Sequence, residues 1–217
     1  MADLPIALEG ALADELARAV DAEGKIIRAL EALGPVAGRD VVLVGDAGGI
    51  RHRQLSEAGA RVAAVRALDA GARALAAGSA DVVLAWWSAF RGLDPGELGH
   101  ADRLLRPGGR LMIVHDYGRD DVSRLRGDLP EYGPWSRRDG PFLAAGFRIR
   151  VLHCWWTFDS LEEMEAFLGA AFGLIGRAVA SQLRRPRLSY NVAIYHRSQA
   201  PEPAGEVASA AAAPERV

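Results

Sequence analysis

The densest group of potentially reactive side chains follows an apolar segment in the middle of the chain. His115, Asp116, Tyr117 and Arg119 come directly after the apolar residues 111–114. A histidine titrates near neutral pH and can take a proton from a substrate when a carboxylate orients it. We therefore expect His115 and Asp116 to be catalytic candidates and Tyr117 and Arg119 to line a substrate pocket. A solvated polar loop has the same composition and is the alternative interpretation.

A second group could bind a nucleotide or a related cofactor. Gly45, Asp46, Ala47 and Gly49 follow the uninterrupted apolar run 41–44 and precede a segment compatible with a helix. Glycine lets a ligand approach the backbone, and a helix N-terminus presents N–H groups that have no partner within the helix. The pattern predicts a binding turn, although glycines at a strand-to-helix turn can also serve tight packing alone.

Aromatic residues follow another expected strand. Trp86 and Trp87 come after the apolar run 81–85, where a tryptophan pair could hold a planar or cationic group. The alternative is that both rings belong to the core. Cys154, the only cysteine, is expected to be a small core residue, and no spacing of His, Asp or Glu indicates a metal site.

The elements that would position these residues alternate between strand and helix. Short β-branched runs predict strands buried on both faces, as in a parallel sheet covered by helices. We expect strands at 41–44, 61–65, 81–85 and 110–115, helices at 50–58 and 95–105, and a turn at Pro107–Gly109. Because parallel strands end at the same edge of a sheet, the groups named above should meet there.

The remaining segments complete an α/β pattern. We expect a single N-terminal helix over 11–33. A long loop over 118–141 could act as a lid with Tyr132 and Trp135. Two further strands are expected at 147–155 and 189–195, with a helix at 161–172 between them. The Ala- and Pro-rich residues 199–217 are expected to form a disordered tail to a single domain over 1–198.

Composition excludes several classes of protein. The 217 residues include 26 basic and 28 acidic ones, so no net charge attracts DNA, RNA or an anionic membrane. No apolar run is long enough to cross a bilayer, and the N-terminus does not resemble a signal peptide. We expect a cytoplasmic protein with a small-molecule substrate that could form a homo-oligomer.

Several motifs, taken in order, resemble class I S-adenosylmethionine-dependent methyltransferases over residues 24–197. Residues 24–49 are similar to the family's entry helix, first strand and glycine turn, and residues 78–83 (GSADVV) are similar to its G-S-F-D-x-V segment. The most specific match is the segment 104–111 (LLRPGGRL), which resembles the L-K/R-P-G-G-x-L motif before strand five. Asp69 stands where members place the aspartate that meets the adenine.

This resemblance implies a Rossmann-like methyltransferase fold, with a mostly parallel sheet and an antiparallel last strand. It implies S-adenosylmethionine as cofactor, bound by Gly45, Asp46, Ala47, Gly49, Arg66, Asp69 and Trp86. The acceptor would be a small molecule, held near Trp87, Tyr117 and Arg119.

The sequence also departs from the family pattern. Leu43 replaces an acidic residue of the first strand, Ala47 replaces the middle glycine, and Arg66 stands where an acidic residue accepts hydrogen bonds from the ribose hydroxyls. A guanidinium has no acceptor, so cofactor binding could be weak or absent.

The family's third strand, at the edge of the sheet, has no counterpart between Val65 and Asp81. Two alternatives therefore stay open: a catalytically inactive methyltransferase-like module for binding or assembly, and an NADP site in which Arg66 holds the 2′-phosphate.

Overall fold

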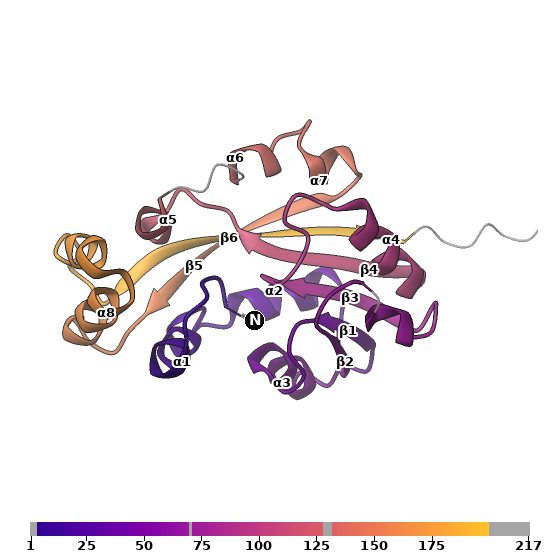
Figure 1. Cartoon of the computed structure of the whole chain (residues 1–217), viewed down its shortest axis with the longest axis horizontal. Coiled ribbons are helices and arrows are strands. Elements are labelled where there is room, and N and C mark those ends of the chain that lie inside the picture. Colours follow the sequence, from indigo (N-terminus) through magenta and orange to yellow (C-terminus); the bar gives the residue numbers. More distant parts are fainter. Residues whose placement is uncertain (1–3, 70, 128–131, 200–217) are drawn as a thin grey trace, which may run out of the picture.

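The computed structural model describes residues 4–69, 71–127 and 132–199. One six-stranded sheet has the order β2-β1-β3-β4-β6-β5 (Figure 1). The strands are β1 (Asp40–Val44), β2 (Arg61–Val65), β3 (Ala80–Trp86), β4 (Leu105–Asp116), β5 (Arg148–Thr157) and β6 (Arg187–Ser198). The helices are α1 (Gly10–Ala19), α2 (Lys25–Leu33), α3 (Ile50–Glu57), α4 (Pro95–Leu104), α5 (Asp121–Arg126), α6 (Tyr132–Trp135), α7 (Pro141–Ala144) and α8 (Leu161–Ala180), with a 3₁₀ turn η1 (Gly71–Ala74).

The parallel part of the sheet forms from the apolar runs in the sequence. β1 pairs in parallel with β2 and β3, and β3 pairs in parallel with β4. β6 runs antiparallel to both β4 and β5. The expected fold class, a mostly parallel α/β sheet with an antiparallel last strand, is confirmed.

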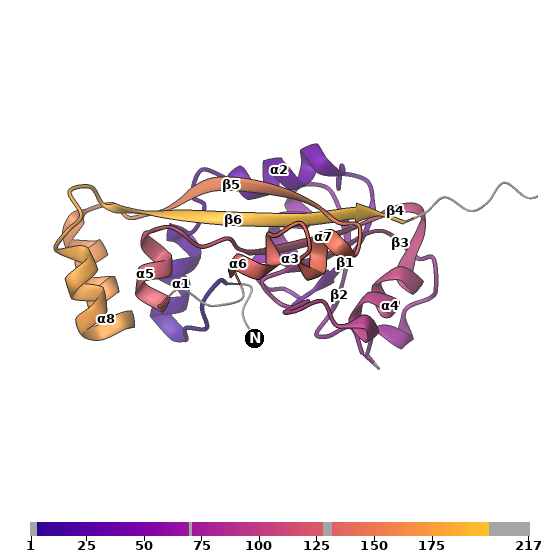
Figure 2. The ribbon, with the colours of Figure 1, turned by 90° about the horizontal axis from the view of Figure 1, so that it is seen from above.

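Helices cover both faces of the sheet, which explains why β1 and β3 are apolar at successive positions. On one face Leu43, Leu84 and Val114 pack with residues of α1, α2, α3 and α8. On the other face Ile113 packs with residues of α4, α6 and α7, among them Phe142. Figure 2 shows α8 and α4 at opposite ends of the molecule, with the long strands β5 and β6 running between them.

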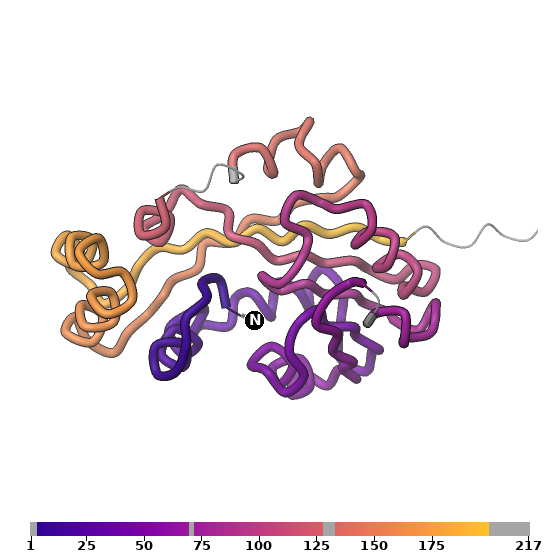
Figure 3. The backbone as a smooth tube through the Cα atoms, in the orientation of Figure 1, coloured from indigo at the N-terminus to yellow at the C-terminus, as the bar shows by residue number. Residues whose placement is uncertain are grey.

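The absence of a third strand between β2 and β3 is confirmed. Within the described residues of 66–79, the only regular element is η1, and β2 lies at the edge of the sheet. Figure 3 shows the chain passing from β2 to β3 through this short segment. A sheet tolerates the loss of an edge strand because only one ladder of hydrogen bonds is removed.

The expectation of one N-terminal helix was wrong, because the chain breaks between α1 and α2. Val20 forms an isolated bridge with Trp156, and Asp21 and Gly24 have positive φ angles of 55° and 66°. The Asp21 carboxylate accepts hydrogen bonds from the backbone N–H groups of Lys25 (2.9 Å) and Ile26 (2.7 Å). Asp21 therefore caps the start of α2, which the apolar spacing alone does not reveal.

The segment Pro107–Gly109 is not a turn before the strand but part of β4, at an irregularity in its pairing with β3. Gly108 has a φ of 77°, which favours glycine. A Cβ on Gly109 would lie 3.0 Å from the Asp81 carbonyl oxygen, so only glycine lets β4 approach β3 here.

The helix expected at 161–172 continues to Ala180 as α8, with a kink at Gly173, whose φ is 60°. The last strands, β5 and β6, are likewise longer than expected, and they pair antiparallel from Arg148–His196 to Thr157–Arg187. Residues 200–217, the expected tail, lie outside the described residues, apart from Gln199 at its start.

Candidate functional site

Two cavities adjoin one another at the carboxyl edge of β1, β2 and β3. The first, the glycine-turn cavity, has a volume of about 240 Å³ and is lined by Gly45, Asp46, Arg66 and Ser88. The second, the α4 cavity, has a volume of about 570 Å³ and also includes Ser88 in its lining. Clefts at this edge of a parallel sheet are the usual place for ligands in α/β proteins. The larger volume falls in the range of small-molecule sites, about 300–1,000 Å³.

The glycine turn is held at the end of β1 by backbone hydrogen bonds. Gly45 N donates to the Val65 carbonyl (2.8 Å), which joins the turn to the end of β2, and Gly49 N donates to the Asp46 carbonyl (3.0 Å). Gly48 has a φ of 77°, a conformation that favours glycine. The following helix, α3, begins without a side-chain cap, so the structure leaves its first N–H groups available for a ligand.

Arg66 and Asp46 face one another across the glycine-turn cavity. The Arg66 Nε lies 3.7 Å from the Asp46 Oδ1, and the Arg66 side chain is 89% exposed. An ion pair this exposed is weak, because solvent screens it and two side chains must be ordered. The structure thus brings together four of the predicted residues, Gly45, Asp46 and Arg66 in this cavity and Asp69 in the next. Ala47 and Gly49 belong to the same turn but are not part of the cavity lining.

The α4 cavity contains most of the polar residues that sequence reasoning missed. Besides Asp69 and Ser88, its lining includes Ala67, Leu68, Arg73, Ala89, Phe90, Arg91, Asp94, Gly96, Glu97 and His100. Glu97 and His100 lie three positions apart on α4, hence on one face of the helix. The segment 94–97 (DPGE) signals a helix start, and Asp94 does cap α4 by accepting from Gly96 N and Glu97 N. That signal could have placed Glu97 near the end of β3.

Glu97 is the acidic group of this cavity whose environment is most unusual. Burial raises the pKa of its carboxyl above the ordinary value, although it accepts a hydrogen bond from Phe90 N (2.9 Å). Partly buried carboxyl groups with raised pKa values in a cavity are candidates for proton transfer.

Trp86 and Trp87, expected to line the cofactor and substrate pocket, belong to the core. Both rings are buried in the core on the side of α3, and the Arg51 guanidinium lies over them, 4.4 Å from the Trp86 ring centroid and 4.9 Å from that of Trp87. Trp86 follows Leu84 by two positions and therefore faces the same side of the sheet. Trp87 follows the end of β3 and has a φ of 60°, so its ring does not alternate to the opposite face but packs on the same side as Trp86. Neither ring lines the two cavities.

His115 was expected to act as a general base, but its side chain is buried in the core and cannot reach a substrate. Its side chain is 2% exposed, and its Nε2 lies 3.3 Å from the Phe90 carbonyl oxygen. The ring packs against Trp135, with 5.0 Å between the ring centroids, and against Phe142. Burial lowers its pKa to about 4. His115 is thus a neutral packing residue beneath α6 and α7, since a base must reach its substrate.

Asp116 lies on the opposite face from His115, because the two are neighbours on a strand. Its carboxylate accepts hydrogen bonds from the Tyr190 hydroxyl and from the Arg126 guanidinium, and it is buried. It anchors α5 and β6 to the end of β4 and does not orient the His115 ring.

The other predicted pocket residues also lie outside the cavity linings. Tyr117 is half-buried and packs against the core beneath α4, α6 and α7. Arg119 is exposed and has a φ of 60°. The segment 118–141, expected to be a lid, carries α5 and α6 and places Trp135 on His115, while residues 128–131 lie outside the described part and the side chain of Tyr132 is not described.

The described residues contain neither a metal-binding cluster nor a membrane-spanning helix. No group of three or more His, Cys, Asp or Glu side chains is arranged to hold a metal ion. None of the described helices combines the length and apolar composition needed to cross a bilayer. Cys154 is buried, as expected, and burial raises its pKa to about 12, which keeps the thiol protonated.

No protein-family model and no curated protein sequence matches the chain. Among solved structures, it is similar to a putative type II methyltransferase from Anaeromyxobacter dehalogenans, with 20% identity, a TM-score of 0.49, and coverage of 81% of this chain and 97% of that one. It is also similar to phosphoethanolamine N-methyltransferase 2 from Haemonchus contortus, solved with S-adenosylhomocysteine: 15% identity, a TM-score of 0.46, and coverage of 89% and 59%.

A third similar structure is a putative sarcosine dimethylglycine methyltransferase from Galdieria sulphuraria, with 12% identity, a TM-score of 0.44, and coverage of 82% and 86%. These likenesses concern the path of the backbone, and the strand order described above establishes the fold class independently. The chain has a Rossmann-like fold, with a mostly parallel sheet that ends in two antiparallel strands.

Proposed function

We propose that this protein binds S-adenosylmethionine at the glycine turn and transfers its methyl group to a small molecule. The observation that carries the proposal is the pair of adjoining cavities at the carboxyl edge, one lined by Gly45 and Asp46 and the other by Asp69. These are three of the positions that the motif resemblance assigns to the cofactor.

The residues present fit the polar groups of this cofactor. The backbone of the glycine turn and the uncapped start of α3 suit a carboxylate, and Asp46 supplies an acceptor for an amino or hydroxyl group. The α4 cavity has room for the adenine, beside Asp69 and the apolar side chain of Phe90. When bound, the cofactor supplies an electrophilic methyl group on a sulfonium.

The chain's part in such a reaction is to orient the acceptor and to accept a proton where the acceptor must lose one. Glu97 is our candidate for the proton acceptor, because it lines the α4 cavity and burial raises its pKa toward neutrality. His115 is not a candidate, since the core encloses it.

Calorimetry with the full chain tests the proposal. S-adenosylmethionine and S-adenosylhomocysteine should bind with one site, whereas NADP should not. Asp46→Ala should weaken binding by about tenfold or more, the effect of losing a charged hydrogen-bond acceptor. Asp159→Ala is the matched control, because Asp159 is an exposed aspartate in the turn between β5 and α8. Equal affinities of the two variants would contradict the proposed site.

A non-catalytic binding module is the second candidate, and one observation favours it. Arg66 stands at the glycine-turn cavity, where a ribose would need an acceptor, and its guanidinium pairs with Asp46. This candidate predicts that none of the three ligands binds. Binding of NADP alone, abolished by Arg66→Ala, would instead support a dinucleotide site.

A further inference from the structure

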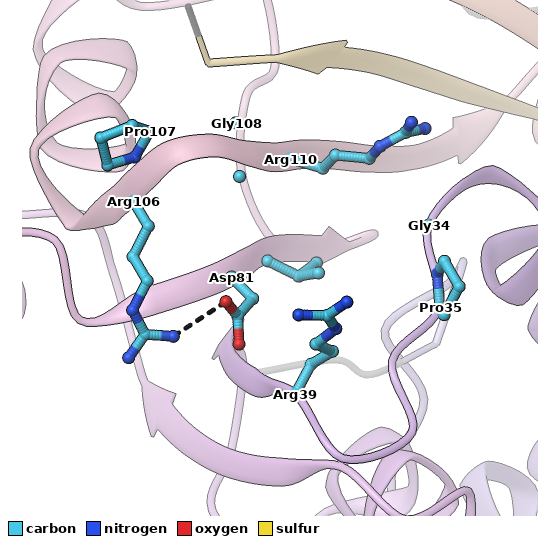
Figure 4. A pocket seen from close by; sticks show the side chains of 10 residues that line it. Gly34, Pro35, Arg39, Asp81, Arg106, Pro107, Gly108 and Arg110 are labelled. Atoms are coloured by element: carbon cyan, nitrogen blue, oxygen red, sulfur yellow. Dashed lines mark ion pairs between the residues drawn. The ribbon is translucent and has the colours of Figure 1, made fainter. Parts of the chain in front are cut away.

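A separate cleft lies at the other end of the parallel strands, where β3 and β4 begin. This amino-end cleft has a volume of about 230 Å³ and is lined by Gly34, Pro35, Arg39, Asp81, Val82 and the segment 106–110 (Figure 4). Three of its lining residues are arginines: Arg39, Arg106 and Arg110. A guanidinium is always charged and presents N–H groups in a fork that matches a phosphate or carboxylate.

The carboxylates at this cleft are already satisfied by other groups. Asp81 accepts a hydrogen bond from Asp40 N (2.9 Å) and forms an ion pair with Arg106 (2.9 Å). Asp40 pairs with Arg106 (2.8 Å) and with Arg61 (2.6 Å), and these hydrogen bonds lower its pKa to about 2. Both carboxylates therefore stay ionised and engaged at neutral pH.

Arg39 also lines the cleft but takes no part in these ion pairs. Across the described ranges of the chain, its side chain has no ion pair and no hydrogen bond, and Figure 4 shows it extending into the cleft beside Asp81. An arginine that lines a cleft without an acceptor has all five N–H donors available.

Arg110 forms the opposite wall and is fixed in place. Its guanidinium donates to the Leu33 carbonyl at the end of α2, and its stem crosses Gly34. A Cβ on Gly34 would lie 2.8 Å from the Arg110 Cδ, so the glycine provides the room for this side chain. The wall is thus built by the packing of two residues distant in sequence.

The charge around the cleft is positive overall. Four guanidiniums, those of Arg39, Arg61, Arg106 and Arg110, accompany three carboxylates: those of Asp40 and Asp81, and that of Glu31, which accepts from Val36 N (3.3 Å) beside Pro35. The positive charge also affects His196 on β6. Burial lowers the pKa of His196, and the charges of Arg110, Arg148 and Arg150 lower it further.

We propose that the amino-end cleft binds the phosphate group of a small ligand. The surplus positive charge attracts an anion, and the cleft has room for a phosphate group together with part of the ligand that carries it. This inference does not depend on the proposed methyl transfer, because the cleft lies at the amino ends of β1, β3 and β4, whereas the candidate site lies beyond the carboxyl ends of β1, β2 and β3. Either can fail without the other.

Calorimetry with inorganic phosphate, at constant ionic strength, tests the proposal on the full chain. We expect one saturable site, and Arg39→Ala should weaken it by about tenfold or more. Because the Arg39 side chain forms no ion pair or hydrogen bond with the described residues, the variant should keep a melting temperature close to the parent's. Arg39→Lys keeps the charge but loses the fork, and should lie between the two.

Two controls separate a built site from general attraction to positive charge. Arg185→Ala removes another exposed arginine, in the turn before β6, and should leave phosphate binding unchanged. Acetate in place of phosphate should bind at least tenfold more weakly. Absence of saturable phosphate binding, equal effects of the Arg39 and Arg185 substitutions, or equal binding of acetate would each overturn the proposal.

Discussion

The two ends of the parallel sheet use charged residues in opposite ways. At the amino end, Asp40 and Asp81 each receive two donors, and the ion pairs connect the starts of β1, β2, β3 and β4. At the carboxyl edge, Asp46 pairs with the exposed Arg66 at 3.7 Å, and Glu97 receives one backbone donor.

Carboxylates that receive several donors hold strands in register, whereas a partly buried carboxyl beside a cavity, such as that of Glu97, is a candidate for proton transfer. The burial of a carboxylate and the donors around it therefore separate those that hold the fold together from those beside a cavity.

The largest expected effect concerns Asp116, a carboxylate at the carboxyl edge that, unlike Asp46 and Glu97, is buried and receives two side-chain donors. Asp116→Ala should destabilise the protein by about 3–5 kcal/mol, because it leaves the Arg126 guanidinium without its buried carboxylate and the Tyr190 hydroxyl without its acceptor. Urea unfolding measures the change.

The matched control is Asp102→Ala, which breaks the partly exposed pair with Arg197 near the amino end. Its expected cost is about 0–1 kcal/mol. Similar losses for the two variants would show that the burial of Asp116 does not matter in the way we describe.

Arg66→Asp should change ligand affinity more than stability. If S-adenosylmethionine occupies the glycine-turn cavity, the new carboxylate can accept hydrogen bonds from ribose hydroxyls, and binding should tighten by about 10- to 100-fold. Calorimetry measures this, with Arg66→Ala as the variant that removes the guanidinium without adding an acceptor. Poorer binding to Arg66→Asp than to the parent would place the ribose elsewhere.

The buried His115 predicts a pH dependence of stability. Its pKa is about 4 in the folded protein and near 6.5 in an unfolded chain, so the unfolded state binds more protons between these values. Stability is therefore full above about pH 6.5 and is lost as the pH falls toward 4, by roughly 2 kcal/mol between pH 7 and pH 5. Urea unfolding of the parent and of His115→Leu should show this loss only in the parent.

Much of the fold could be predicted from the sequence, because strands that are buried on both faces have uninterrupted apolar runs. The apolar runs of β1, β2 and β3 appear within one residue of their expected bounds, and the short link after Val65 indicated the missing strand. The break between α1 and α2 could not be predicted from the apolar spacing. It depends on the Asp21 cap and on the bridge to β5, which is distant in sequence.

The candidate site was only half predictable. Gly45, Asp46, Arg66 and Asp69 follow strands directly, and parallel topology alone gathers them at one edge. The burial of Trp86 follows from alternation with Leu84, a signal that was available, whereas that of Trp87 depends on its positive φ. The helix start at 94–97 could have placed Glu97 near the end of β3, but not its partial burial. Arg39 could not be found, because its surroundings depend on which partners the other charges at the amino end take.

The smallest expected effect concerns Ser88, which belongs to both cavities. Its hydroxyl donates to the Val44 carbonyl at the end of β1 and so holds the chain after β3 against the glycine turn. Ser88→Ala removes one neutral hydrogen bond and should destabilise the protein by about 1 kcal/mol. Because Ser88 also positions the shared wall, S-adenosylmethionine affinity should fall several-fold.

Ser160 offers the matched control, since it also makes a side-chain hydrogen bond, to Glu163 N at the start of α8. Ser160→Ala should lower stability by a similar amount, because it removes a helix cap, yet leave ligand affinity unchanged. If both serine variants lowered affinity equally, the loss would reflect stability alone, and the shared wall at Ser88 would have no special part in binding.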